Sequence, residues 1–504
     1  MVNFLFKSRY FIALSFIFFI ARFTLITSMP IFNDEAVYLD WGWREIHNPG
    51  WLFYSLYDAK PPLLMWLFAL STQVFPTALI GGRAIGVLFG YFTLLGIWMT
   101  AKHIMSQRAA YIAAISYTVI PLFSFFDRQA LMESAIGAVG VWLFYAVIRL
   151  IESNKRRWPA FIGFLLGVGF FIKPTALLFV GPMALILGYY YLYKTKSVKL
   201  FFIDIVIMSG VSVAILLPLF LQSTFWETFY LNFRYTALTL PGELISNLLQ
   251  KTIQTFHILV LDLLPISFFF FLMAIIVAVV KRSKLLLLAS AWVLTGVSIN
   301  IFSLKGVNER YLVSFLPLVC VLISYFITTL KHKNYQYISI FLLIITAETI
   351  TLLQVFAPVT YFRLLSSVSS KAFIEYREGF SSGFGVSEAV KFLEKRIGDQ
   401  PAFIATAVHT GNPESGIMTA FMKRDNVVVS YLEASYINDI YSYDCLSSQT
   451  PLYFVSREND LAGLERYFQQ LYFERSPISN FGIGIYTLKE QCQGNTLNLK
   501  GYKT

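Results

Sequence analysis

Long runs of apolar residues separated by short polar segments fill the first 360 residues of the chain. A run of about 20 apolar residues is long enough to cross a membrane as a helix. Lipid offers no hydrogen-bond partner to the main chain, so such runs must be helical. The pattern predicts a polytopic α-helical membrane protein with about 11 transmembrane helices. We expect them near residues 10–28, 82–101, 109–126, 130–150, 159–172, 175–193, 200–221, 255–280, 284–303, 310–330 and 337–357.

The pattern changes after about Ser366, where apolar runs become short and alternate with polar residues. Residues 386–398 have helical periodicity and end in glycine, and 461–471 form an amphipathic helical pattern. Alternating helices and strands predict a small α/β domain. We therefore expect a transmembrane catalytic domain over 1–360 and a small α/β domain over 361–504. Strands are expected at 402–407, 426–431, 452–457 and 481–488.

Composition supports the membrane interpretation, since 57% of the residues are hydrophobic and 14% are charged. Soluble proteins carry about 25% charged residues. The net charge of +11 does not indicate nucleic-acid binding, because the basic residues cluster in alternate loops, the pattern of cytoplasmic loops. No small-residue cleavage site follows the first span, so we expect it to be retained. The chain is thus predicted to be a multi-pass protein of the cell membrane, with a cytoplasmic N-terminus and an extracytoplasmic C-terminal domain.

The three cysteines are Cys320, in an apolar span, and Cys445 and Cys492, in the domain expected outside. A disulfide between the last two is left open by the sequence. His257 and His409 are isolated, and no convincing metal motif occurs. The sequence therefore leaves cofactors undecided, with a divalent metal neither required nor excluded.

The first expected extracytoplasmic loop, 29–81, opens with the adjacent acids Asp34 and Glu35. Asn33 is placed to cap a helix beginning at Asp34, and the helix dipole favours anions in the first turn. A carboxylate kept ionised beside the membrane is suited to accept a proton from an alcohol. The alternative is that both acids only cap and solvate the helix.

Asp58 and Lys60 follow in the same loop, directly before two prolines that stiffen the chain. The prolines begin a segment over 62–75 that is too short to span and is expected to lie along the membrane surface. Lys60 can hold a phosphate as a point charge or can extend towards lipid headgroups.

Further ionisable residues occur at the ends of later spans on the same expected side. Glu133 lies just inside an apolar span, where an ionisable group is costly and usually faces a cavity. Each cation alone could extend to the interface, yet the positive-inside rule predicts few cations on this side. The set comprises Asp127, Arg128, Glu133, Lys173, Lys305, Glu309, Arg310 and Tyr311.

Taken together these motifs resemble the C-type membrane glycosyltransferases. They are an Asp-Glu pair after the first span, Lys-Pro-Pro-Leu, Arg-x-x-x-x-acid, a lysine before the sixth span, and Lys…Arg-Tyr-Leu-x-x-x-x-Pro. More narrowly, they resemble the protein O-mannosyltransferase-like and aminoarabinose-transferase-like branch, glycosyltransferase family 39 and its relatives. The resemblance covers the chain to about residue 360 and is most specific over 33–133. The C-terminal domain is similar only in position and general pattern.

The resemblance implies an inverting enzyme that moves a sugar from a polyprenyl phosphate to a hydroxyl of a protein, lipid or glycan. It assigns catalysis to Asp34 with its neighbour Glu35. It assigns Asp58, Asp127, Glu133 and Tyr311 to the surroundings of the site. Relatives commonly have Asp where this chain has Glu133, and some of them use a divalent ion. Binding of the donor phosphate is assigned to Lys60, Arg128, Lys173, Lys305 and Arg310.

Two other classes remain open: a transporter or flippase of lipid-linked sugars, and a receptor or scaffold that binds a partner through the C-terminal domain. Transporters place ionisable groups near the midplane and often contain paired broken repeats, and neither feature is evident here. The sequence does not identify the sugar, the acceptor or the oligomeric state.

Overall fold

The computed structural model describes residues 9–153, 155–195, 197–236, 241–303, 308–369, 371–407, 411–432, 451–457 and 468–488. The chain divides into two compact units. The first comprises Met1–Ile26, Asn48–Leu67 and Arg83–Phe356, and the second comprises Thr27–His47, Phe68–Gly82 and Ala357–Thr504. The expected domain limits at 360 and 361 stay a prediction.

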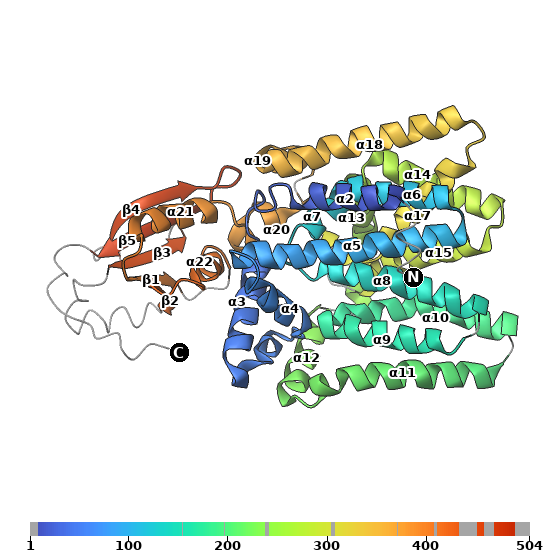
Figure 1. Ribbon diagram of the computed structural model, residues 1–504, viewed down its shortest axis with the longest axis horizontal. Helices are drawn as coiled ribbons and strands as arrows, with labels where there is room; N and C mark the ends of the chain where they lie inside the picture. The colour runs from blue at the N-terminus through green and yellow to red at the C-terminus, as the bar shows by residue number, and fades with distance from the viewer. Residues whose placement is uncertain are drawn as a thin grey trace. The chain divides into compact units, whose positions relative to one another are not determined.

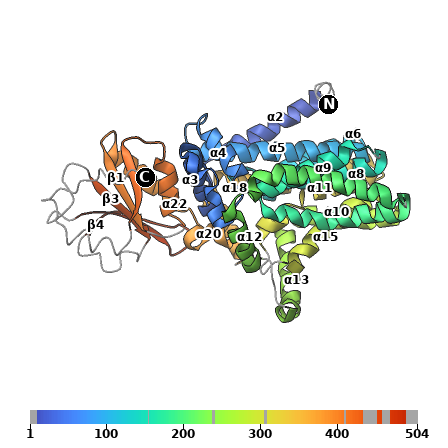
Figure 2. The same cartoon turned by 90° about the horizontal axis from the view of Figure 1, so that it is seen from below.

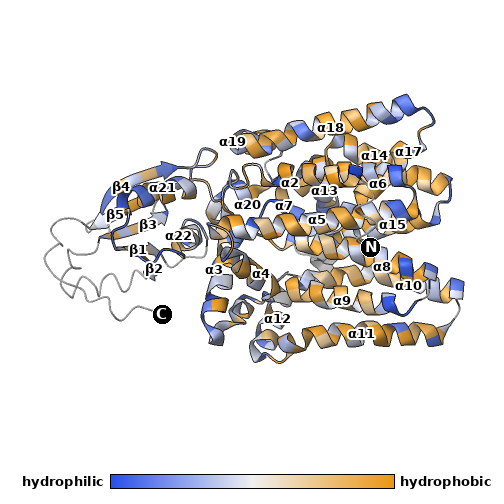
Figure 3. Cartoon of the chain, in the orientation of Figure 1, coloured by the Kyte–Doolittle hydropathy of each residue, from blue (hydrophilic) through white to orange (hydrophobic). Residues whose placement is uncertain are grey.

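The first unit is a bundle of helices, several of which run in nearly parallel directions (Figures 1 and 2). Apolar residues predominate along α9, α11 and α18 (Figure 3), as expected of helices in lipid. The helices are α2 (Arg9–Phe23), α5 (Ala78–Ile104), α6 (Gln107–Val119), α7 (Pro121–Asp127), α8 (Glu133–Ser153), α9 (Arg157–Ile172), α10 (Val180–Tyr189), α11 (Val198–Phe220), α12 (Ser223–Thr236), α13 (Pro241–Leu263), α14 (Pro265–Val280), α15 (Lys284–Ser303), α16 (Glu309–Leu312), α17 (Pro317–Thr329) and α18 (Lys333–Phe356).

Six helical segments of the described residues are long and apolar enough to cross a membrane, and up to eight if each bent pair is one span. The expected number of about 11 is therefore not confirmed. The helices α4 (Leu63–Thr72), α9 and α17 are apolar but shorter. The coarser prediction of a mostly helical protein with several apolar helices is confirmed.

Several of the expected spans are interrupted. Within 109–126, α6 and α7 meet at a bend of 67°. Residues 255–280 do not form one straight helix, because α13 and α14 meet at a bend of 111°. Leu264 at the bend has φ 67°, and Pro265, which lacks an N–H, begins the next helix. Likewise 310–330 divides into the single turn α16 and a separate helix α17 that starts at Pro317.

The expected first loop, 29–81, contains two helices and two short 3₁₀ turns. The 3₁₀ turns are η1 (Pro49–Trp51) and η2 (Tyr54–Asp58). Helix α3 (Asn33–His47) carries the two acids. Helix α4 (Leu63–Thr72) lies where a surface helix was expected, which confirms the helix and leaves its position at the membrane a prediction.

The second unit contains a five-stranded sheet in the order β2-β1-β3-β5-β4. β2, β1 and β3 are parallel, and β5 and β4 are antiparallel to their neighbours. Helices α21 (Val386–Ile397) and α22 (Glu414–Phe421) belong to the same unit, and apolar residues of both share a core with the sheet. The strands are β1 (Ala402–Ala407), β2 (Val427–Leu432), β3 (Leu452–Arg457), β4 (Phe468–Arg475) and β5 (Gly482–Leu488).

The four expected strands are confirmed to within a residue at their ends. The helix expected over 461–471 is wrong at its C-terminal end, because β4 begins at Phe468. The rest of that segment, Cys445 and Cys492 lie outside the described residues. Cys320 is buried in α17.

Candidate functional site

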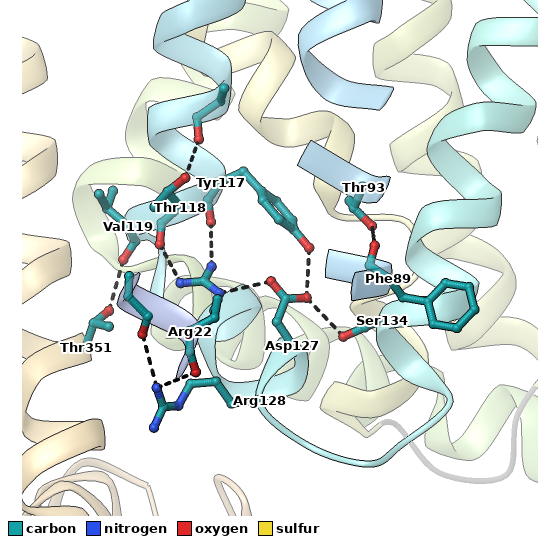
Figure 4. Close-up of polar contacts among 12 residues, drawn as sticks. Arg22, Phe89, Thr93, Tyr117, Thr118, Val119, Asp127, Arg128, Ser134 and Thr351 are labelled. Atoms are coloured by element: carbon teal, nitrogen blue, oxygen red, sulfur yellow. Dashed lines mark hydrogen bonds and ion pairs between the residues drawn. The ribbon is translucent and has the colours of Figure 1, made fainter. Parts of the chain in front are cut away.

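Arg22 near the end of α2 forms a buried ion pair with Asp127 at the end of α7 (Figure 4). Arg22 Nε lies 3.1 Å from Asp127 Oδ2, and neither residue is more than 1% exposed. The hydroxyls of Tyr117 and Ser134 donate to Asp127 Oδ1 over 2.9 and 3.0 Å. The other two guanidinium nitrogens of Arg22 donate to main-chain carbonyls of α6. A buried ion pair needs such additional partners, so Asp127 is an anchor for α2.

Arg128, the next residue, closes the C-terminal end of α2 (Figure 4). Its Nη1 donates to the carbonyls of Arg22 and Thr24 at 2.9 and 2.8 Å, and Nη2 donates to that of Leu25 at 2.7 Å. The last carbonyls of a helix have no partner within the helix. Arg128 supplies one here, which gives it a structural role. Its expected role at a donor phosphate stays a prediction.

Glu133, Lys173 and Arg310 meet in one buried cluster, although 40 and 177 positions separate Glu133 from the two cations. Lys173 Nζ donates to Glu133 Oε1 at 2.8 Å, and Arg310 Nε donates to the same oxygen at 2.9 Å. The Glu133 side chain is fully buried, and those of Lys173 and Arg310 are 15% and 13% exposed. Lys173 Nζ also lies 5.3 Å from the ring centroid of Tyr311.

Each member of this cluster occupies the end of an element. Glu133 begins α8, and Lys173 is the extended C-cap of α9, held there by the following proline. Arg310 lies in the single turn α16. Two cations share one carboxylate, so the cluster carries a net positive charge. Glu133 Oε2 accepts no hydrogen bond from any residue that the structure describes. The arrangement suits the binding of an anion that also offers a donor group.

Lys60 and Asp58 form a separate, looser pair. Lys60 Nζ lies 3.5 Å from Asp58 Oδ2, and the side chains are 29% and 61% exposed. Exposed pairs of this kind contribute at most about 1 kcal/mol to stability, so Lys60 can exchange Asp58 for another anion at little cost. Lys305 lies outside the described residues.

Glu35 is engaged at the start of α3. The Phe32 carbonyl accepts the first helical hydrogen bond from Ala36 N, and the Phe32 N–H donates to Glu35 Oε2 at 3.0 Å. A carboxylate three residues into a helix that accepts from the cap residue is one half of a capping box. The expectation that Asn33 caps the helix is wrong, because Asn33 Oδ1 has no hydrogen-bond partner among the described residues. The buried Glu35 takes that role instead.

Asp34, the neighbour of Glu35, is only half-buried. Its Oδ2 accepts a hydrogen bond from the Tyr38 hydroxyl one turn later, at 3.3 Å. Of the two acids, Asp34 is therefore the more accessible carboxylate, and it is oriented by its own helix.

Sequence reasoning missed Arg22, whose side chain is fully buried. The signal was available, because an arginine within an apolar span needs an internal partner. The partner itself, 105 positions later, could not be read from the pattern.

No group of three or more His, Cys, Asp or Glu side chains with metal-ligand geometry occurs in the part of the chain that the structure describes.

Comparison with known families gives one match, over residues 59–226, to the family described as dolichyl-phosphate-mannose-protein mannosyltransferase. This segment contains Lys60, Arg128, Glu133 and Lys173. No curated protein shows significant sequence similarity to the chain.

Solved structures with the same fold cover nearly the whole chain. ArnT from Cupriavidus metallidurans bound to undecaprenyl phosphate matches with a TM-score of 0.64 and 12% identity, over 97% of this chain and 99% of that one. Its apo form gives 0.58 and 13%, over 96% and 98%. An Archaeoglobus fulgidus oligosaccharyltransferase tethered with an acceptor peptide gives 0.51 and 14%, over 96% and 74%. At such identities the likeness establishes the fold. With the family match, it confirms the resemblance that the motifs indicated.

Proposed function

Because the chain shares its fold and its motifs with the C-type membrane glycosyltransferases, we propose that it is an inverting glycosyltransferase. Its donor is a sugar carried on a polyprenyl phosphate, and its acceptor is a hydroxyl group on the extracytoplasmic side. The observation that carries the proposal is the cluster of Glu133, Lys173 and Arg310, which has the charge and burial that a phosphate-binding site requires.

The cluster stabilises the leaving group. When the bond between the sugar and the phosphate breaks, the electron pair and a negative charge remain on the phosphate oxygen. Lys173 and Arg310 bind that oxygen with charge-assisted hydrogen bonds, which are strongest in a buried site. Lys60 and Lys305 add further positive charge. No proton donor is required, because a phosphate is a good leaving group.

Asp34 activates the acceptor. The acceptor oxygen attacks the anomeric carbon as the phosphate departs from the opposite face, which inverts the configuration in a single displacement. Asp34 takes the hydroxyl proton late in this step. Glu35 keeps the start of α3 in place and takes no proton.

The topology follows from the basic loops. We assign the N-terminus to the cytoplasm and the 361–504 region to the outside, with the remaining apolar helices completing about 11 spans. Crystallised ArnT binds undecaprenyl phosphate, which supports a long polyprenyl chain as the donor lipid. The acceptor class, whether protein, lipid or glycan, and the sugar are to be identified by experiment.

The test uses the full-length protein in liposomes with a radiolabelled polyprenyl-phosphate sugar and envelope material from cells that lack the protein. We expect labelled acceptor and free polyprenyl phosphate in equal amounts, with mass spectrometry identifying the product. Movement of intact donor across the bilayer without release of polyprenyl phosphate would favour the flippase. If the protein neither transfers the sugar nor moves the donor, the result would favour the scaffold.

Removing one cation of the cluster tests the site. Lys173→Gln is expected to raise the donor KM about 10- to 100-fold, because a hydrogen bond to a charged group contributes about 1.5–3 kcal/mol. Lys173→Arg keeps the charge and should stay close to the wild-type value. Lys284→Gln, at the exposed start of α15, is the matched control and should leave KM unchanged. Equal donor KM in Lys173→Gln and wild type would contradict the assignment.

A further inference from the structure

We propose that the α/β part of the second unit is a component of the catalytic apparatus, because it fixes the main chain on both sides of Asp34. This inference rests on the proposed function of Asp34. It assigns Asn412 and Thr419 as positioning residues that act through α3 and do not touch the substrates.

Asn412 holds the chain before the helix. Its Nδ2 donates to the Ile31 carbonyl at 2.9 Å, and the residue is fully buried. Ile31 lies three positions before Asp34 and packs against the core of the α/β fold. A buried amide hydrogen bond of this kind is costly to leave unmade.

Thr419 of α22 holds the other side. Its Oγ1 donates to the carbonyl of Ala36, two positions after Asp34, at 2.9 Å. The main-chain carbonyl of Ser415 within α22 also lies 2.9 Å from this hydroxyl, so the single hydroxyl proton is shared between the two carbonyls. Asp34 thus lies between two points, Ile31 just before α3 and Ala36 within it, at which the chain is bound to the α/β fold.

Two further contacts hold the same segment. The rings of Phe32 and Tyr376 stack with centroids 4.1 Å apart. Gly383 lies so close to the segment that a Cβ atom there would be 1.9 Å from the Ile31 carbonyl oxygen. The contact is therefore with the main chain itself, and any larger residue at 383 must displace the start of α3.

The Asn412 loop is tied in turn to the sheet. Arg457 at the end of β3 donates from Nε to the Asn412 carbonyl at 2.9 Å. Its Nη2 forms an ion pair with the buried Glu414 at 3.1 Å. A continuous set of contacts therefore runs from β3 through Asn412 and Ile31 to the helix that carries Asp34.

The consequence is kinetic. A misplacement of about 1 Å at a reacting group can lower a rate about 10²-fold. Loosening α3 should therefore reduce kcat, while donor binding, which we assign to Lys173 and Arg310, is unaffected.

The test compares paired variants of the full-length protein. Asn412→Asp replaces the donor with an acceptor that faces the Ile31 carbonyl, and Thr419→Val removes the hydroxyl without changing the size. We expect both to lower kcat about 10- to 100-fold with the donor KM unchanged. Thr419→Ser restores the hydroxyl and should restore most of kcat. Asn426→Ala is the matched control, because its amide also donates to two main-chain carbonyls, those of Gly398 and Gln400, but not to α3.

Hydrogen–deuterium exchange of a peptide covering 31–36 gives a readout that does not depend on activity. Exchange should rise in Thr419→Val and stay at the wild-type level in Asn426→Ala. Unchanged exchange, or wild-type kcat in Thr419→Val, overturns the inference. If exchange rises in Thr419→Val but the wild-type protein transfers no sugar, the contacts that hold α3 are supported and only the proposed function is overturned.

Discussion

Asp34→Asn is expected to lower kcat for sugar transfer by about 10²- to 10⁴-fold, the range that a positioned general base contributes. The substitution keeps the size of the side chain and an oxygen that can accept from the Tyr38 hydroxyl. It removes the negative charge and the capacity to take the acceptor proton. Donor KM should therefore be unchanged. The measurement is the initial rate of labelled product in liposomes at saturating donor.

Asp40→Asn provides a matched control on the same helix. Asp40 pairs with Arg44 at 2.8 Å, one turn further along α3. Burial raises the pKa of the Asp40 carboxyl above its ordinary value despite the neighbouring Arg44. Folding thus disfavours its ionised form, so losing that charge at neutral pH costs little. If Asp34→Asn and Asp40→Asn transferred sugar at the same rate, Asp34 would not be the base.

Asp127→Asn is expected to destabilise the protein by about 3–5 kcal/mol, the cost of removing one partner of a buried ion pair. The Arg22 guanidinium would remain buried without the Asp127 charge, in contact with main-chain carbonyls of α6 (Figure 4) and with the Phe18 ring. Tyr117 and Ser134 would both lose the carboxylate that accepts their hydroxyls. We expect a lower midpoint of thermal unfolding in detergent and a lower level in membranes.

The same Asp40→Asn variant serves as the control for stability, because a partly exposed pair contributes at most about 1 kcal/mol. A double variant in which Arg22 becomes Met and Asp127 becomes Leu removes both charges together. It should recover part of the lost stability, since replacing a whole buried pair by apolar residues is often neutral. An unfolding midpoint of Asp127→Asn equal to that of Asp40→Asn would show that the pair does not anchor α2.

The sequence was informative at positions where a membrane makes an unpaired ionisable group energetically costly. Glu133 and Lys173 are ionisable groups at the ends of apolar spans, and such groups need partners. That requirement predicted that Glu133 faces a cavity, and the structure places Lys173 and Arg310 beside its carboxylate. Which carboxylate takes which cation was not predictable, because the contacts join residues 40 and 177 positions apart.

Other features depend on geometry that a linear pattern does not contain. Arg128 has the residue type and motif of an anion ligand, yet two of its nitrogens bind the end of α2. The last main-chain carbonyls of a helix need hydrogen-bond partners, but the sequence pattern does not say which residues provide them. At β4, pairing with β5 outweighs the helical periodicity of the preceding residues. Local preference is a weak predictor where sheet contacts compete with it.

The second unit is assembled from three separate stretches of chain, Thr27–His47, Phe68–Gly82 and Ala357–Thr504. Ile31 from the first stretch packs against its core, and Lys423 from the third donates to the carbonyls of Thr72 and Phe75 in the second. A fragment that begins at Ala357 would lack Ile31, and the apolar core residues that Ile31 packs against would be exposed. Swapping this region between related proteins would require exchanging all three stretches together, so the sheet and the helix that carries Asp34 must be transferred as one block.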